Sequence, residues 1–385
     1  MPNFNGYINS KLPEVGTSIF SKMSALANDY NAINLSQGFP QDNPPKELIK
    51  LVHQNMQQGY NQYAPMKGNA ALRTNLAAKV KQLYNAEYNT DTEITITAGG
   101  TQAISATITA LINIDDEVII LQPAYDCYAP SVKLAGGMPV YFNLRYPNFS
   151  IDWDLFKKAI NPKTKMIIIN NPHNPSGTIL KKEDLEELTH LLDGTDILVL
   201  ADEVYEHLVF DEANHQSVML FDDLKKRSIV IYSFGKTYNC TGWKIGYCFA
   251  PHQLMKEIRK VHQYQVFSVN NPIQMALAAF LENTTYLKKL TTTLQQKRDL
   301  FRAGLAHSKF ELLKCESTYF QLAKYKEISN KGDMEFCKEL TTKHKVAAIP
   351  VSAFYNDKTD YKLIRFCFAK SNDILKQATD ILCKI

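Results

Sequence analysis

Polar side chains follow three apolar runs of the chain, at the point where each run ends. Lys236 follows one run, Asp202 and Tyr205 follow another, and Asn174 follows a third. The runs are residues 229–232, 197–201 and 166–169. Because ligands of parallel sheets bind beyond the carboxyl ends of the strands, we expect these four side chains to share one site. An amine, a carboxylate, a phenol and an amide together suit pyridoxal phosphate.

Each of these side chains has a chemical task if that cofactor is bound. Lys236 would form the imine with its aldehyde, and Asp202 would hold the pyridine nitrogen protonated. A buried carboxylate without a cationic partner would neutralise itself, so a bound pyridinium gives Asp202 a reason to be there. Tyr205 and Asn174 are candidate donors to the ring oxygen O3′. The alternative interpretations are a surface lysine, a core tyrosine and an asparagine in an Asn-Pro turn.

The cofactor phosphate needs backbone N–H groups at the start of a helix. Two glycines precede a helix that we expect over residues 103–112, and a hydroxyl and a lysine elsewhere would add to the site. The phosphate-binding candidates are Gly100, Thr101, Gln102, Ser233 and Lys244. Tyr125, which follows the apolar run 117–121, is the candidate to lie on the face of the ring.

Arg365 is the candidate for the α-carboxylate of an amino-acid substrate. It alternates with Leu363 and Cys367 and so shares an apolar face of an expected strand. A guanidinium is costly to bury alone but binds a carboxylate through two parallel hydrogen bonds. The alternative is that Arg365 pairs with an aspartate or glutamate of the chain itself.

Two other motifs are rejected on spacing. Gly235, Lys236 and Thr237 resemble the end of a P-loop, but Val230 stands where that motif needs its first glycine. Asp202, Glu203, Glu206 and His207 have no known metal-ligand spacing, so no metal is expected.

The bulk composition is that of an ordinary globular protein. The chain has 385 residues, 45% hydrophobic and 21% charged, and a net charge of +4 spread among scattered lysines, which argues against a nucleic-acid partner. Seven cysteines without a CxxC pair suggest reduced, buried thiols. The first residues do not resemble a signal peptide, and the longest aliphatic stretch is too short to span a bilayer. We therefore expect a soluble cytoplasmic protein.

Continuous β-branched runs alternating with helical segments predict an α/β fold with a mostly parallel sheet between helices. The last residues change character, with strands expected at 315–322 and 361–368 among helices. We therefore expect a large α/β domain at residues 46–285. A smaller α+β domain would be formed by both ends of the chain, residues 1–45 and 286–385.

Several segments resemble the class I aminotransferases of fold type I, which depend on pyridoxal phosphate. Within that class the chain is most similar to the group of bacterial methionine aminotransferases and kynurenine aminotransferases. The likeness runs almost from end to end. The segments that carry it are residues 33–40, 61–66, 170–177, 202–207, 233–247 and 362–370.

The resemblance implies the same roles for the candidates above. It adds that Gly38 and Asn174 help Arg365 to bind the carboxylate, and that Tyr63 reaches the cofactor from a neighbouring subunit of a homodimer with shared sites. Lys244 stands where many relatives carry arginine, and it still supplies the charge. Phe20, Phe39 and Tyr63 would form the pocket wall, which favours apolar or aromatic amino acids such as methionine.

The implied reaction is a ping-pong transamination between an amino acid and a 2-oxo acid. Lys236 would move the proton from Cα to C4′ as general base and then acid. The closest alternative on the same scaffold is a kynurenine aminotransferase or a β-lyase of cysteine S-conjugates. A transcription regulator that binds the cofactor is the alternative from another class. It needs a helix-turn-helix domain, for which the residues before Ser18 are too few.

Overall fold

The computed structural model describes residues 6–281 and 283–385. Within them, seven strands form a central sheet in the order β2-β8-β7-β6-β5-β3-β4. All of these strands run in one direction except β8, which is antiparallel to both of its neighbours. The strands are β2 (Ile94–Thr97), β3 (Glu117–Gln122), β4 (Met138–Asn143), β5 (Thr164–Asn170), β6 (Leu198–Asp202), β7 (Ser228–Ser233) and β8 (Gly246–Phe249).

The apolar runs form strands because both faces of the sheet are covered. Ile119, Ile167 and Val199 pack on one face against α3, α7 and α11. Their neighbours in sequence, such as Ile168 and Leu200, pack on the other face against α4, α5 and α10. Successive residues of a strand point to opposite faces, so a strand buried on both sides needs apolar residues at nearly every position. The expected α/β architecture is confirmed.

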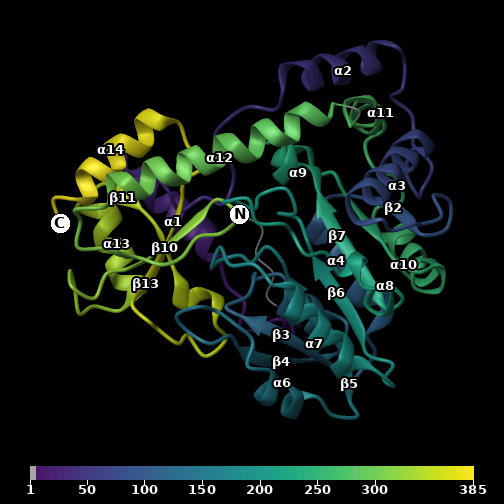
Figure 1. Cartoon of the computed structure of the whole chain (residues 1–385), viewed down its shortest axis with the longest axis horizontal. Helices are drawn as coiled ribbons and strands as arrows, with labels where there is room; N and C mark the ends of the chain where they lie inside the picture. Colours follow the sequence, from purple (N-terminus) through teal and green to yellow (C-terminus); the bar gives the residue numbers. More distant parts are fainter. Residues whose placement is uncertain (1–5, 282) are drawn as a thin grey trace.

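Helices surround this sheet and continue into the C-terminal part of the chain (Figure 1). Around the central sheet they are α2 (Lys46–Gln57), α3 (Ala70–Tyr84), α4 (Gly100–Leu111), α5 (Tyr128–Leu134), α6 (Trp153–Ala159), α7 (Lys182–Leu192), α8 (Asp222–Lys225), α9 (Phe234–Thr237), α10 (His252–Gln265) and α11 (Asn271–Phe280). The others are α1 (Ile19–Asp29), α12 (Thr284–Gly304), α13 (Asp333–Thr342) and α14 (Asn372–Leu382).

A second group of strands lies beside the central sheet and has its own apolar core. Its four-stranded antiparallel sheet has the order β12-β13-β10-β9, and a further pair joins β1 to β11. These strands are β1 (Ile33–Asn34), β9 (Glu311–Leu312), β10 (Phe320–Lys324), β11 (Val346–Ala347), β12 (Ile349–Pro350) and β13 (Leu363–Cys367). Ile33 pairs with Val346, so the N-terminal segment joins the C-terminal strands. Figure 1 shows α12 running from α14, on the side of the second group of strands, towards α11 on the side of the central sheet.

One strand boundary differs from the expectation. The strand expected at residues 315–322 begins only at Phe320. Thr318 has φ of +64°, and the backbone N–H groups of Glu316 and Thr318 donate to Gly177 and Leu208. Bonds to loops of the central sheet, rather than to a neighbouring strand, therefore bend the chain here.

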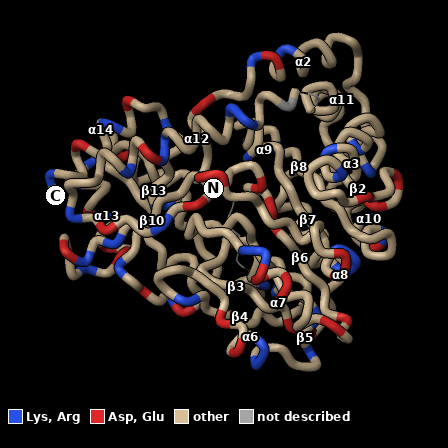
Figure 2. The backbone as a smooth tube through the Cα atoms, viewed as in Figure 1, with Lys and Arg blue, Asp and Glu red and all other residues tan. Residues whose placement is uncertain are grey.

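Charged residues of both signs are interspersed along the chain (Figure 2). The net charge of +4 is therefore spread over the molecule. Among the residues described, no helix combines the length and apolar character needed to cross a bilayer.

Candidate active site

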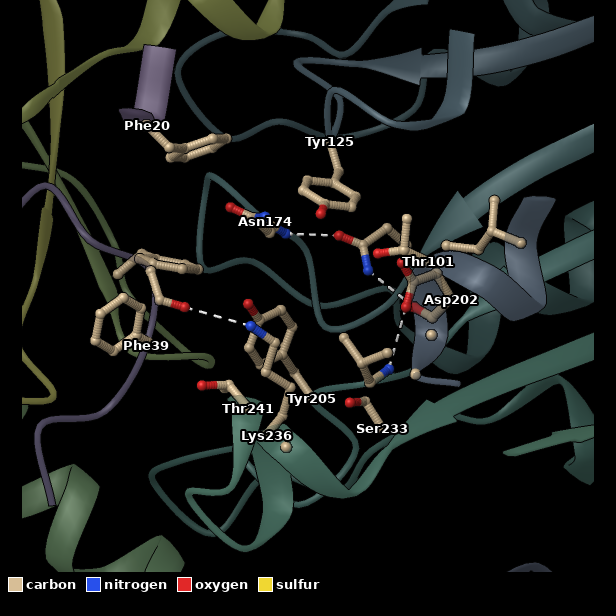
Figure 3. A pocket seen from close by; sticks show the side chains of 18 of the residues that line it. Phe20, Phe39, Thr101, Tyr125, Asn174, Asp202, Tyr205, Ser233, Lys236 and Thr241 are labelled. Carbon is tan, nitrogen blue, oxygen red and sulfur yellow. Dashed lines mark hydrogen bonds between the residues drawn. The ribbon is translucent and has the colours of Figure 1, made fainter. Parts of the chain in front are cut away.

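A cavity of about 230 Å³ opens where β2, β5, β6 and β7 end. Figure 3 shows Asp202, Thr101 and Ser233 at one end of this space and Phe20 and Phe39 at the other. One end is therefore polar and the other apolar. The predicted site residues that line it are Phe20, Gly38, Phe39, Gly100, Thr101, Tyr125, Asn174, Asp202, Tyr205, Ser233, Lys236, Lys244 and Arg365.

Lys236 reaches this cavity from α9, the short helix that follows β7. Its Nζ donates to the backbone oxygen of Gly38 over 3.3 Å. The amine also lies 5.6 Å from the ring centre of Tyr205 and 5.9 Å from that of Tyr319. Because this enclosure removes water from the ammonium form, the pKa of Lys236 falls to about 8, although Asp202 opposes the shift. About a tenth of the amine is therefore neutral and nucleophilic at pH 7, far more than for a lysine of ordinary pKa.

Asp202 is the last residue of β6, and 4% of its surface is exposed. Oδ2 accepts a hydrogen bond of 2.6 Å from the hydroxyl of Tyr128, and Oδ1 accepts one of 3.3 Å from the backbone of Val204. Burial raises the pKa of Asp202 to about 6, although the bond from Tyr128 opposes the shift. The hydrogen-bond partners of this carboxylate are thus neutral groups, which leaves its charge available to a cationic ligand.

Arg365, on β13, is fully buried and directs its guanidinium into the same cavity. It donates to Oδ1 of Asn174 over 2.6 Å and to the backbone oxygen of Ser36 over 3.5 Å. The guanidinium also lies 3.8 Å from the ring centre of Phe320. Burial lowers the pKa of Arg365 to about 10. Its hydrogen-bond acceptors are an amide and a backbone carbonyl, so no ion pair with an aspartate or glutamate of the described residues is seen.

Glycines bring the backbone close to the polar end of the cavity. Gly99 has φ of +86°, a conformation that favours glycine, and α4 begins at Gly100. A side chain at Gly246 would place its Cβ 2.8 Å from the carbonyl carbon of Gly99, so β8 and the turn can approach only without one. This approach leaves the first N–H groups of α4 beside Lys244, an arrangement suited to an anion.

Two predicted residues lie outside the cavity of the chain itself. The side chain of Gln102 accepts from the backbone of Ala98 and donates to Gln265. Tyr63 is 81% exposed, and its ring lies 5.3 Å from that of Phe267.

The sequence interpretation missed several lining residues, among them Tyr128, Thr241 and Phe320. Tyr128 stands three positions after Tyr125, at the first residue of α5, and nothing in the sequence shows that its side chain turns towards the site. Phe320 is the first residue of β10, and the misplaced start of that strand concealed which way its side chain points.

Residues 30–382 match the family described as aminotransferase class I and II. The chain belongs to this family. Its fold is accordingly fold type I, and its cofactor is pyridoxal 5′-phosphate. The chain is therefore a pyridoxal-phosphate-dependent aminotransferase.

Similar proteins span nearly the whole chain. Methionine aminotransferase of Escherichia coli is 47% identical over 375 residues, which cover 97% of each chain. A crystal structure from Escherichia coli, described as having a methionine aminotransferase function, has a TM-score of 0.96 at 46% identity and covers 98% of this chain and all of that one. Human kynurenine–oxoglutarate transaminase 3 is 34% identical, covering 98% of this chain and 90% of its own length.

The residues at the cavity fit pyridoxal phosphate. Nε of Arg365 is buried without a hydrogen-bond partner among the described residues, which leaves a donor for an anionic substrate. The carboxylate of Asp202 can hold a protonated ring nitrogen, and the amine of Lys236 can condense with an aldehyde. The glycine turn at Gly99 and Gly100 leaves room for a phosphate beside Lys244.

Proposed function

We propose that this aminotransferase moves the amino group of methionine, or of another apolar or aromatic amino acid, to a 2-oxo acid in a ping-pong cycle. One observation carries the proposal. A lysine of lowered pKa, a buried carboxylate with neutral partners and an arginine with a free donor line the same cavity. These three groups can bind an amino acid and act on its Cα.

Each polar group of the cofactor has a candidate partner in or beside the cavity. Lys236 would bond to the aldehyde carbon, Asp202 would hold the ring nitrogen, and Tyr205 and Asn174 would contact O3′. Tyr125 would lie on the ring face. The phosphate would be bound by Gly100, Thr101, Gln102, Ser233 and Lys244. When bound, pyridoxal phosphate supplies an aldehyde that condenses with amines and a protonated ring that withdraws electrons from the substrate's Cα.

The amine of Lys236 would carry the proton from the substrate's Cα to C4′ of the cofactor. With an amino-acid substrate bound, this amine would be unbonded and would remain in the cavity beside the substrate's Cα. An amine with a pKa of about 8 is basic enough to remove a proton from Cα and acidic enough, once protonated, to return it. The backbone oxygen of Gly38, 3.3 Å from Nζ, would hold the amine in place between these events.

Arg365 would bind the α-carboxylate of the substrate, aided by Asn174 and the backbone of Gly38. The bond between Arg365 and Asn174 fixes the orientation of the guanidinium before the substrate arrives. Such preorganisation lowers the entropic cost of binding. With the carboxylate held there, the Cα–H would lie in the space that Lys236 lines.

The apolar end of the cavity supports an apolar side chain in the substrate. Phe20 and Phe39 lie there (Figure 3), and Arg365 is the only arginine among the described residues that line the cavity. A second carboxylate, as in aspartate, would therefore lack a matching guanidinium. The thioether of methionine packs well against aromatic rings. The similarity to the Escherichia coli methionine aminotransferase favours the same donor.

Steady-state kinetics with purified enzyme would test this choice of donor. We expect kcat/KM for methionine to exceed that for aspartate by about two orders of magnitude, since a buried, unmatched carboxylate costs several kcal/mol. Equal values, or a preference for aspartate, would refute the proposed donor class.

A second candidate activity is transamination of kynurenine, with β-elimination from cysteine S-conjugates as a related reaction. The relatives named kynurenine–oxoglutarate transaminase favour it, at 34% identity for those of Dictyostelium discoideum and human. Measuring the release of pyruvate and ammonia from a cysteine S-conjugate would separate elimination from transfer.

We also propose the quaternary and domain organisation expected from the sequence. Tyr63 is exposed in the single chain, as a residue that serves a neighbouring site would be, which supports a homodimer with shared sites. Residues 46–285 would form the large domain, and residues 1–45 and 286–385 the small one. All seven cysteines are free, which supports a cytoplasmic location.

A further inference from the structure

Tyr128 makes the shortest hydrogen bond to the carboxylate of Asp202. Its hydroxyl donates to Oδ2 over 2.6 Å, while the backbone N–H of Val204 lies 3.3 Å from Oδ1. Tyr128 is 2% exposed and Asp202 is 4% exposed, so water does not replace this bond if it is lost. A hydroxyl that donates to a buried carboxylate stabilises the ionised form over the neutral acid.

The position of Tyr128 follows from the turn that also carries Tyr125. Tyr128 is the first residue of α5, and its backbone N–H donates to the oxygen of Tyr125 over 3.3 Å. The two rings meet edge to face, with centres 5.8 Å apart. One turn therefore brings one tyrosine to the cavity and the other to Asp202.

Other titratable groups surround Asp202, but none replaces this donor. The amine of Lys236 favours the ionised carboxylate, and Glu203 disfavours it. The remaining titratable groups that face it are Tyr125, Cys127 and Tyr205. Lys236 donates to Gly38 and not to Asp202, so Tyr128 is the side-chain donor to this carboxylate among the described residues.

We propose that Tyr128 is a positioning residue, whose hydroxyl keeps Asp202 ionised and oriented for the ring nitrogen of pyridoxal phosphate. This inference rests on the proposed function, because it assumes that Asp202 binds that nitrogen. Tyr128 then acts on the cofactor through Asp202.

The direction of the effect follows from the pKa of Asp202. Burial raises this pKa to about 6, and the bond from Tyr128 is the largest influence that opposes the rise. Without the hydroxyl the pKa rises further, so more of the carboxyl is protonated at neutral pH. A neutral carboxyl attracts a pyridinium less, so the affinity for the cofactor ring falls.

The test compares two probes on the full chain freed of cofactor. The first is 4′-deoxypyridoxine 5′-phosphate, which has the ring nitrogen but no aldehyde and so cannot bond to Lys236. The second is its 1-deaza counterpart, in which carbon replaces that nitrogen. We expect Tyr128→Phe to weaken binding of the first probe by about tenfold at neutral pH. The affinity for this probe falls as the pH is lowered, and in the variant we expect that fall to begin at a higher pH. Binding of the deaza probe should stay within about twofold.

Tyr88→Phe is the matched control. The hydroxyl of Tyr88 is buried without a hydrogen-bond partner among the described residues, so its loss should affect neither probe. If Tyr128→Phe weakens the binding of both probes equally, Tyr128 only supports packing. If it weakens the binding of neither probe, its hydroxyl has no role at the site. Both results would overturn the inference. A wild-type chain that binds both probes equally well would instead overturn the assignment of Asp202 in the proposed function.

Discussion

Burial displaces the pKa values of three charged side chains in the cavity. The pKa of Lys236 falls to about 8, that of Asp202 rises to about 6, and that of Arg365 falls to about 10. Each shift favours the neutral form, because the charged form has lost its water. Ligands that bring the opposite charge relieve this cost for Asp202 and Arg365. The charges of Asp202 and Arg365 are therefore paired only when a ligand of opposite charge binds beside each of them.

Arg365→Lys tests the residue that would bind the substrate. A lysine keeps the charge but cannot form the two parallel bonds to a carboxylate, nor stack on Phe320. We expect kcat/KM for methionine to fall by about two orders of magnitude, with little change in the affinity for the cofactor. Arg302→Lys is the control, because Arg302 bonds to Leu313 and Gln321 away from the cavity. An equal loss in both variants would contradict the assigned role.

Among the elements, α3 is tied to the segment that follows β6. Glu206 lies four residues after Asp202 and is hydrogen-bonded by Lys79 and Tyr84 of α3. Burial alone would raise the pKa of Glu206, but His207, Lys79 and Tyr84 together hold it at about 2. These contacts stabilise the folded state above about pH 4.5, which is the pKa of an ordinary glutamate. That stabilisation is lost as the pH falls towards 2.

Lys79→Met tests that connection. It leaves Glu206 buried without its lysine, and we expect the free energy of unfolding to fall by about 3 kcal/mol at neutral pH. Urea denaturation measures the change. Lys81→Met, two positions along the same helix, is the control, because Lys81 pairs with Glu87 at an exposed position and contributes little. A similar, small effect of both substitutions would show that the buried pair does not hold α3 in place.

At the scale of the whole molecule, distant parts of the chain meet at one cavity. Lys236 from the central sheet bonds to Gly38 in the N-terminal segment, and Arg365 near the C-terminus bonds to Asn174. Tyr63 lies outside this arrangement in the single chain. The proposed homodimer would bring it to the site of the neighbouring subunit.

Complementation between inactive variants tests that arrangement. Lys236→Ala removes the amine, and Tyr63→Ala removes the residue that would serve the other subunit. If Tyr63 acts across the interface, a mixed dimer has one intact site. After unfolding and refolding the two variants together, we expect about a quarter of wild-type activity, because half of the dimers are mixed and each has one working site. No recovery would place Tyr63 at its own subunit's site, and about half of wild-type activity would mean that Tyr63 serves neither site.

The sequence predicted the α/β fold because its strands are buried on both faces and therefore read as unbroken apolar runs. It predicted Lys236, Asp202 and Asn174 because each lies within five residues of the end of such a run. The short strand β8 was missed, because its apolar residues Tyr247, Cys248 and Phe249 are not β-branched. The start of β10 was misplaced, because hydrogen bonds to distant loops, which a local pattern does not contain, bend residues 315–319.

Tyr128 shows the same limit within the site. An isolated tyrosine near the start of a helix has no sequence signal for the partner of its hydroxyl. Only the placement of α5 beside α4, β3 and β4 brings its hydroxyl to Asp202. Contacts between side chains that are 74 positions apart depend on the tertiary arrangement, which spacing alone does not define.

The central claim is that the amine of Lys236 carries the cofactor. Borohydride reduction of the cofactor-loaded enzyme makes that bond permanent, and mass spectrometry of the digested protein then locates it. We predict a single pyridoxyl phosphate group on the peptide that contains Lys236. A group on any other lysine, or none at all, would contradict the account.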